Sequence, residues 1–246
     1  MRIALFSDIH GNREALTTCL DHADRMGAER FVFLGDYVGY GADPAWVVET
    51  VREGVARGAL AVLGNHDQAV WQGRGGLNAT AEAALAWTRP RLPPDAVAFL
   101  RSLPMEIEEE DRLYVHADAS APSRWNYVMD AEAARRSMAA AEARITICGH
   151  VHVPALFGIT ATEKLMAFRP VDGVPVPIPR PRRWLAVLGA VGQPRDGNPA
   201  ACYTMLDSDA LTLTWHRVPY DVETAMAKIR AAGLPEVLAT RLAKGR

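Results

Sequence analysis

Leu63-Gly64-Asn65-His66-Asp67 places an amide, an imidazole and a carboxylate at three consecutive positions of the chain. The short apolar run that ends at Leu63 predicts a buried strand that delivers these residues into a loop. A turn requires only the glycine and the asparagine, so the added histidine and aspartate indicate a functional site. Such a site needs partners of similar chemistry elsewhere in the chain.

Four other stretches carry ligand-type side chains, and each of them follows an apolar run of strand length. They are Asp8-Ile9-His10, Gly35-Asp36, His116 and Gly149-His150-Val151-His152. In open α/β sheets, ligands bind beyond the carboxyl ends of the strands. We therefore expect all five stretches to meet at one edge of the structure.

The order of the predicted elements indicates an α/β fold. Residues 2–6, 31–34 and 59–63 are predicted strands, separated by helices that begin after Asn12 and Asp43. Further strands are predicted at the apolar runs 113–115, 145–148, 156–159, 165–168, 184–188, 202–206 and 211–215. Further helices are predicted at 131–143 and 221–244. Strand–helix units followed by consecutive strands predict a four-layer α/β/β/α sandwich of two packed mixed sheets with helices on the outer faces.

We expect residues 1–246 to form a single domain with a helical cap at about 72–101. Gly73, Gly75 and Gly76 predict a flexible break, and helices are predicted at 77–88 and 95–101. Because no strand separates these helices, they either lie as a cap beside the site or simply cover the sheet.

Composition and charge narrow the classes of partner and compartment. The chain has 246 residues, of which 49% are hydrophobic and 23% charged, and its net charge of −2 argues against nucleic acid as a partner. Three scattered cysteines do not form a disulfide framework, which favours a cytoplasmic location. The sequence shows neither a signal peptide nor a run of about 18 apolar residues, so no membrane partner is expected. A homo-oligomer is left open.

The ligand-type residues are numerous enough for two metal ions. In extended backbone, positions i and i+2 face the same way, so Asp8 with His10, and His150 with His152, can each hold one ion. The seven candidate metal ligands are Asp8, His10, Asp36, Asn65, His116, His150 and His152. One tetrahedral ion needs about four ligands, so we expect two divalent ions that share a bridging carboxylate. Mixed nitrogen and oxygen ligands favour manganese, iron or zinc.

These blocks resemble the calcineurin-like metallophosphoesterase superfamily, in particular its small bacterial phosphoesterases. The family pattern is Asp-x-His, Gly-Asp, Gly-Asn-His-Asp/Glu, a later His and Gly-His-x-His, and all five blocks occur here in order between residues 8 and 152. The resemblance implies two β-sheets sandwiched between helices. It also implies one metal on Asp8, His10, Asp36 and His152, and a second metal on Asp36, Asn65, His116 and His150, with Asp36 bridging.

Two cations about 3.5–4 Å apart make hydroxide available near neutral pH, and the site keeps a net positive charge that attracts phosphate. His66 is not among the implied ligands. It is therefore expected to protonate the departing oxygen as general acid, with Asp67 orienting its ring. The alternative is a structural histidine that supports the metal ligands.

Departures from the relatives narrow the substrate. Protein phosphatases of the superfamily carry arginines where this chain has Leu63 and Val38-Gly39-Tyr40-Gly41, so a phosphoprotein substrate is not expected. The chain is more similar to small phosphoesterases, some of which cleave phosphodiesters or dinucleoside polyphosphates. Asn12, Arg13 and Arg195 are candidate contacts to such a small phosphorylated substrate, although an ordinary surface role is the alternative for the arginines.

Three other functions remain open. A catalytically weak metal-binding scaffold of the same fold typically lacks the acid histidine, whereas His66 is present here. A phosphomonoesterase is the second alternative. A nuclease needs an extended basic groove, for which the net charge gives no support.

Overall fold

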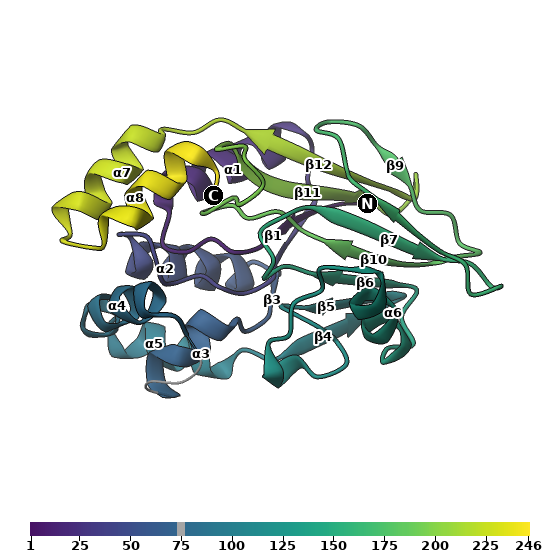
Figure 1. Cartoon of the computed structure of the whole chain (residues 1–246), viewed down its shortest axis with the longest axis horizontal. Coiled ribbons are helices and arrows are strands. Elements are labelled where there is room, and N and C mark those ends of the chain that lie inside the picture. Colours follow the sequence, from purple (N-terminus) through teal and green to yellow (C-terminus); the bar gives the residue numbers. More distant parts are fainter. Residues whose placement is uncertain (73–76) are drawn as a thin grey trace.

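Two six-stranded sheets form the centre of the computed structural model, which describes residues 1–72 and 77–246 (Figure 1). The first sheet has the order β3 (Leu60–Ala61), β2 (Arg30–Phe33), β1 (Arg2–Phe6), β11 (Ala201–Asp207), β12 (Thr212–Val218) and β9 (Val176–Pro177). The second has the order β4 (Glu106–Glu109), β5 (Arg112–Val115), β6 (Ile145–Cys148), β10 (Arg183–Val187), β7 (Ala155–Ile159) and β8 (Leu165–Phe168). Both sheets contain parallel and antiparallel pairs, as predicted.

Helices flank both sheets. They are α1 (Arg13–Arg25), α2 (Pro44–Ala56), α3 (Asn65–Gln72), α4 (Ala79–Thr88), α5 (Pro94–Ser102), α6 (Ala131–Ala139), α7 (Val222–Ala231) and α8 (Glu236–Lys244), with 3-10 turns η1 (Arg89–Arg91) and η2 (Pro122–Arg124). In Figure 1, α3, α4, α5, α7 and α8 gather on the left, whereas α6 lies over the strands of the second sheet on the right. The predicted sandwich is confirmed.

Strand β1 shows how side-chain alternation builds the layers. Ile3 and Leu5 are fully buried in the core between the sheets, where Trp184 of the second sheet also lies. Ala4 and Phe6 point the other way, into the cluster that the first sheet forms with α1, α2 and α5. Because β1 is buried on both faces, its sequence is almost continuously apolar.

Several predicted boundaries were wrong. The residues after Gly64 do not form a loop, because helix α3 begins at Asn65. Strand β4 was not predicted, since three of its four residues are glutamates, which are depleted in strands. Its pairing with β5 supplies the stability that local propensity does not. The predicted helix over 131–143 ends at Ala139.

The helices of the predicted cap pack against the rest of the protein. Leu85 and Leu100 are fully buried in the cluster that includes α1 and α2. Asn78 accepts a hydrogen bond from the Ala81 backbone N–H at 3.0 Å and so begins α4. The predicted break at Gly73, Gly75 and Gly76 lies outside the described residues. A single domain and a closing cap both stay predictions.

Of the helices in residues 1–72 and 77–246, none combines the length and the apolar character needed to cross a membrane. The three cysteines, Cys19, Cys148 and Cys202, are buried and unpaired.

The turn between β4 and β5 provides a pH-dependent test of the fold. Partial burial raises the pKa of Asp111, but Arg144 Nε, 2.7 Å away, and Arg112 outweigh burial and hold it below its usual value. A carboxyl group whose pKa is lower in the folded state stabilises the fold at pH values above its unfolded-state pKa of about 4. This stabilisation is lost as the pH falls through the folded-state pKa. We expect Asp111→Asn to lower the Tm of metal-free protein by about 2 °C at neutral pH, and by less near pH 3.

Thermal unfolding at the two pH values measures this difference, with the exposed Asp21→Asn as the matched control. A deficit of equal size at both pH values would contradict the assigned ion pair.

Candidate metal centre

Strands from both sheets end at one place, and their following residues form a buried polar cluster. The seven predicted ligands come from the ends of β1, β2 and β3 in the first sheet and of β5 and β6 in the second. All seven are buried, with no more than 8% of any of them exposed. Five of the chain's seven histidines lie in or beside this cluster. Such a concentration of buried ionisable groups requires either mutual pairing or a bound cation.

The backbone reaches this geometry by an unexpected route. The sequence predicts extended backbone at Asp8–His10 and at His150–His152, so that alternate side chains face the same way. That prediction is wrong. Five of the seven residues have left-handed backbone, with φ between 50° and 67°: Asp8, His10, Asp36, His150 and His152. Such conformations cost about 1–3 kcal/mol each in non-glycine residues and concentrate at functional sites. The chain therefore turns tightly at each ligand instead of running past it.

Two glycines allow the segments to approach one another. A Cβ atom on Gly64 would lie 2.1 Å from the backbone nitrogen of Asp36, and one on Gly149 would lie 1.8 Å from the Ser7 hydroxyl oxygen. Any side chain at either position would push the ligand-bearing loops apart. The glycines of the Gly-Asn-His-Asp and Gly-His-Val-His stretches are therefore required by close packing.

Each of the four histidines predicted as metal ligands is oriented by a hydrogen bond to a backbone carbonyl. The Nδ1 atoms of His10, His116 and His152 lie 3.0, 2.6 and 2.6 Å from the carbonyl oxygens of Val38, Leu34 and Gln193, respectively. For His150, Nε2 lies 2.9 Å from the Trp125 carbonyl oxygen. Since a carbonyl only accepts, the ring nitrogen nearest to it carries the proton, and the other nitrogen is left for a metal.

Those remaining nitrogens point at one another and at carboxylate oxygens. The Nε2 atoms of His10 and His152 are 3.2 Å apart, and His152 Nε2 is also 3.2 Å from Asp8 Oδ1. That oxygen is buried and has no hydrogen-bond partner among the described residues. Two imidazole lone pairs and an unpaired carboxylate oxygen repel one another unless a cation lies between them. The residues present therefore fit a metal ion.

Asp36 lies between the two groups of histidines. Its Oδ1 accepts the backbone N–H of His66 at 2.8 Å, which leaves Oδ2 to face the cluster. This Oδ2 is 3.6 Å from His10 Nε2 and 3.4 Å from His116 Nε2. His116 Nε2 also lies 3.2 Å from Asn65 Oδ1. One carboxylate thus adjoins ligand atoms from both sheets, grouped as Asp8–His10–His152 and Asp36–His116–His150.

The pKa shifts of three histidines in the cluster agree with a cation-binding centre. Burial lowers the pKa of His10, and burial together with the His116 charge lowers that of His150 to about 3, which keeps both rings neutral. For His116, burial is outweighed by Asp36 and Asp8, which raise its pKa to about 9. Two buried carboxylates thus recruit a positive charge, and a metal on Asp36 would displace this proton.

The structure gives Asp67 a role other than the predicted one. Its Oδ2 accepts the backbone N–H groups of Asp36 and Gly64 at 2.8 and 3.0 Å, and its Oδ1 accepts those of Tyr37 and Val38 at 2.9 and 3.2 Å. The expectation that Asp67 orients the His66 ring was therefore wrong. Asp67 instead holds the backbone turn that carries Asp36.

His66 is buried between two rings at the edge of the cluster. Its ring centroid is 4.8 Å from that of His10 and 4.6 Å from that of Tyr40. Nδ1 has no hydrogen-bond partner in the part of the chain that the structure describes. Burial lowers the pKa of His66, although the Asp36 carboxylate opposes this. His66 also lies close enough to His10 and Asp36 to be counted in one possible ligand group.

The predicted substrate contacts differ in their surroundings. Asn12 accepts the backbone N–H of Ala15 and donates to the Gly192 carbonyl and the Tyr220 hydroxyl, so its polar atoms are engaged within the fold. Arg13 is exposed, and its guanidinium lies 4.8 Å from the Trp46 ring centroid. The Arg195 guanidinium lies 5.7 Å from the Tyr40 ring centroid, beside His66. All three contacts stay predictions.

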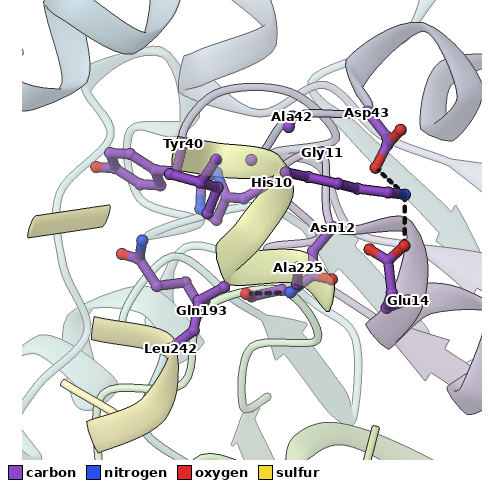
Figure 2. A pocket seen from close by; sticks show the side chains of 14 residues that line it. His10, Gly11, Asn12, Glu14, Tyr40, Ala42, Asp43, Gln193, Ala225 and Leu242 are labelled. Carbon is purple, nitrogen blue, oxygen red and sulfur yellow. Dashed lines mark hydrogen bonds and ion pairs between the residues drawn. The ribbon is translucent and has the colours of Figure 1, made fainter. Parts of the chain in front are cut away.

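The structure contains an ion-pair cluster that the sequence did not reveal, and we call it the Lys228 clamp. Its interactions with the side chains of Asp43 and Glu14 are dashed in Figure 2. Lys228 Nζ on α7 donates to Asp43, at 2.8 Å, and to Glu14. Asp43 precedes α2, as predicted, and Glu14 lies in the first turn of α1. The ammonium therefore ties the C-terminal helices to the segment that carries His10 and Tyr40. The lysine lies more than 180 residues from either partner, so no local pattern could reveal this contact.

Two packed mixed sheets with a buried cluster of metal-ligand side chains at one edge define a metal-binding α/β-sandwich protein. The structure is similar to the crystal structure of a metallophosphoesterase from Sphaerobacter thermophilus, with a TM-score of 0.87, 39% sequence identity, and coverage of 100% of this chain and 99% of that one. It also shares its fold with the hypothetical protein PH1004 from Pyrococcus horikoshii, with a TM-score of 0.77, 18% identity, and coverage of 100% and 98%. The uncharacterized protein MJ0912 of Methanocaldococcus jannaschii is 33% identical over 99% of this chain and 98% of its own length.

The model of the calcineurin-like phosphoesterase superfamily domain matches residues 1–210, and the chain belongs to this family. The resemblance read from the five sequence blocks is confirmed. Membership makes the chain a phosphoesterase-type hydrolase of a metal-dependent family that acts on small phosphorylated substrates. Helices α7 and α8 lie beyond the matched residues, so the Lys228 clamp connects them to the family domain.

The Asp67 carboxylate can be tested by an isosteric change. Asp67→Asn replaces an oxygen that accepts two backbone N–H groups with an amide nitrogen that donates. We expect the free energy of unfolding of metal-free protein to fall by about 2 kcal/mol or more, measured by urea denaturation, because buried donors lose their acceptor. The exposed Asp24→Asn is the control, with an expected change below about 0.5 kcal/mol. A loss equally small in Asp67→Asn would refute the anchoring role.

Proposed function

We propose that this protein is a dinuclear metal-dependent phosphohydrolase that cleaves phosphodiester or nucleotide phosphoanhydride bonds. The observation that carries the proposal is the position of Asp36, whose Oδ2 lies within 3.6 Å of ligand nitrogens from both histidine groups. A carboxylate placed in this way suits a bridge between two ions. Family membership supports the reaction class.

Each ion has its own set of ligands in this proposal. One set consists of Asp8, His10, Asp36 and His152, and the other of Asp36, Asn65, His116 and His150. Manganese, iron or zinc suits these mixed imidazole, carboxylate and amide ligands. When bound, the two ions supply a water nucleophile at neutral pH and neutralise the charge of the phosphate.

His66 holds the proton that the departing oxygen needs. Its ring stands beside His10 and Tyr40, and its Nδ1 is buried without a partner among the described residues, so the ring has spare hydrogen-bonding capacity. Burial lowers the pKa of His66 in the absence of substrate. A phosphate anion brought next to the ring raises that pKa and favours the protonated form, which can then donate to the leaving oxygen.

Arg195 is the best placed of the proposed substrate contacts. Its guanidinium lies over the Tyr40 ring and can bind a phosphate oxygen through two N–H groups. Its Nη2 also donates to Gln193 Oε1 at 3.1 Å, which limits its freedom. Asn12 is a weaker candidate, because the fold already uses its polar atoms, and Arg13 is an exposed candidate that lies against the Trp46 ring. We also propose a cytoplasmic location, which the three free cysteines support.

Leaving-group dependence tests the proton donor. p-Nitrophenolate departs without protonation, whereas an alkoxide needs a proton. We expect His66→Ala to lower kcat by about 10²–10⁴ on a diester with an alcohol leaving group, and by much less on bis-p-nitrophenyl phosphate. His22→Ala, on α1, is the matched control, and metal analysis must show equal ion content in all three proteins.

Equal losses on both substrates with metal retained would remove His66 from the role of general acid. Hydrolysis of monoesters alone would identify a phosphomonoesterase. Two bound ions without turnover of any ester would identify the scaffold.

A further inference from the structure

A cavity of about 360 Å³ adjoins the metal centre between helix α3 and the segment around Trp125. Two predicted metal ligands, Asn65 and His150, form part of its wall. The remainder comes from helix α3, from Leu77, and from η2 with the residues that follow it, including Gln68, Gln72 and Trp125. A group attached to a phosphate at the metal centre can therefore extend into this cavity and stay in contact with the protein.

The far wall of the cavity is anchored to the metal centre itself. Trp125 has left-handed backbone, with φ of 55°, and this turns its carbonyl oxygen toward His150 Nε2 at 2.9 Å. Its indole Nε1 donates to Gln68 Oε1 on α3 at 3.1 Å. The same residue thus orients a metal ligand and fixes the shape of the cavity.

Tyr127 presents an aromatic face at this wall. Its ring is stacked on the His150 ring, with centroids 4.2 Å apart and planes inclined by only 13°. The side chain is nevertheless 49% exposed, which is unusual for an aromatic residue held so firmly beside a buried site. With one face on His150, the other face is available to a planar ring.

The polar groups around Tyr127 suit a nucleoside better than a purely apolar group. Gln68 uses its Oε1 for Trp125, which leaves its amide N–H groups as donors, and Gln72 adds a second amide to the lining. Ser123 and the exposed Arg124 contribute a hydroxyl and a positive charge. An aromatic platform with amide donors and one cation matches the flat face, the polar edge and the phosphate of a nucleotide.

We propose that this cavity binds the nucleoside part of a nucleotide phosphodiester, with Tyr127 stacking on the base. The inference rests on the proposed phosphohydrolase function and specifies its substrate class. Base–aromatic stacking of this kind is tolerant of sequence, so several bases are accepted.

Two substrates with the same leaving group isolate the nucleoside contribution. p-Nitrophenyl thymidine 5′-phosphate and methyl p-nitrophenyl phosphate both release p-nitrophenolate, but only the first carries a nucleoside. In metal-loaded wild-type protein we expect kcat/KM to be about 10-fold or more higher for the nucleotide, and Tyr127→Ala to reduce this ratio to near 1. Tyr127→Phe should restore the ratio, since it keeps the ring.

Further variants separate stacking from general damage. Gln72→Ala changes another wall of the cavity and should lower the ratio by a few-fold, whereas Met129→Ala, 69% exposed on the same segment, should leave it unchanged. Equal kcat/KM for the two substrates in wild-type protein would overturn this inference alone. Absence of turnover of both substrates would overturn the proposed function and the inference with it.

Discussion

Backbone carbonyl groups fix the tautomers of four buried imidazoles, and the rest of the site depends on this constraint. Each ring gives one N–H to the main chain and turns its other nitrogen toward a shared interior where Asp8 and Asp36 also point. Imidazole lone pairs and carboxylate oxygens at distances of 3.2–3.6 Å form a stable arrangement only around positive charge. Metal binding is therefore built into the hydrogen bonding of the fold.

The cost of this arrangement appears in the backbone, and neighbouring packing offsets it. Five ligand positions adopt left-handed φ values, and Gly64 and Gly149 leave room for segments that would otherwise collide. Asp67 binds four backbone N–H groups and so holds the turn that bears Asp36. Such supports explain how strained residues persist, because the surrounding contacts determine the backbone more strongly than local preference does.

Much of the architecture could be predicted from local pattern. Apolar runs located most of the strands, and ligand-type residues at strand ends indicated the site edge and its metal chemistry. Pattern failed where tertiary contacts override propensity: glutamate-rich β4 is held by β5, and Asn65 begins a helix instead of a loop. It also failed for Lys228 and for Tyr127, whose partners lie far away in the chain. Those contacts depend on how the layers pack, and the hydrophobic periodicity of the sequence carries no information about that packing.

The proposed dinuclear centre depends on Asp36, whose carboxylate we expect to contact both metal ions. Crystals of the protein loaded with manganese, measured at the manganese absorption edge, locate the ions directly by anomalous scattering. Two ions per chain are predicted, one on His10 and His152 and the other on His116 and His150, with the Asp36 carboxylate in contact with both. A single ion, or two ions with Asp36 bound to only one of them, would contradict the account.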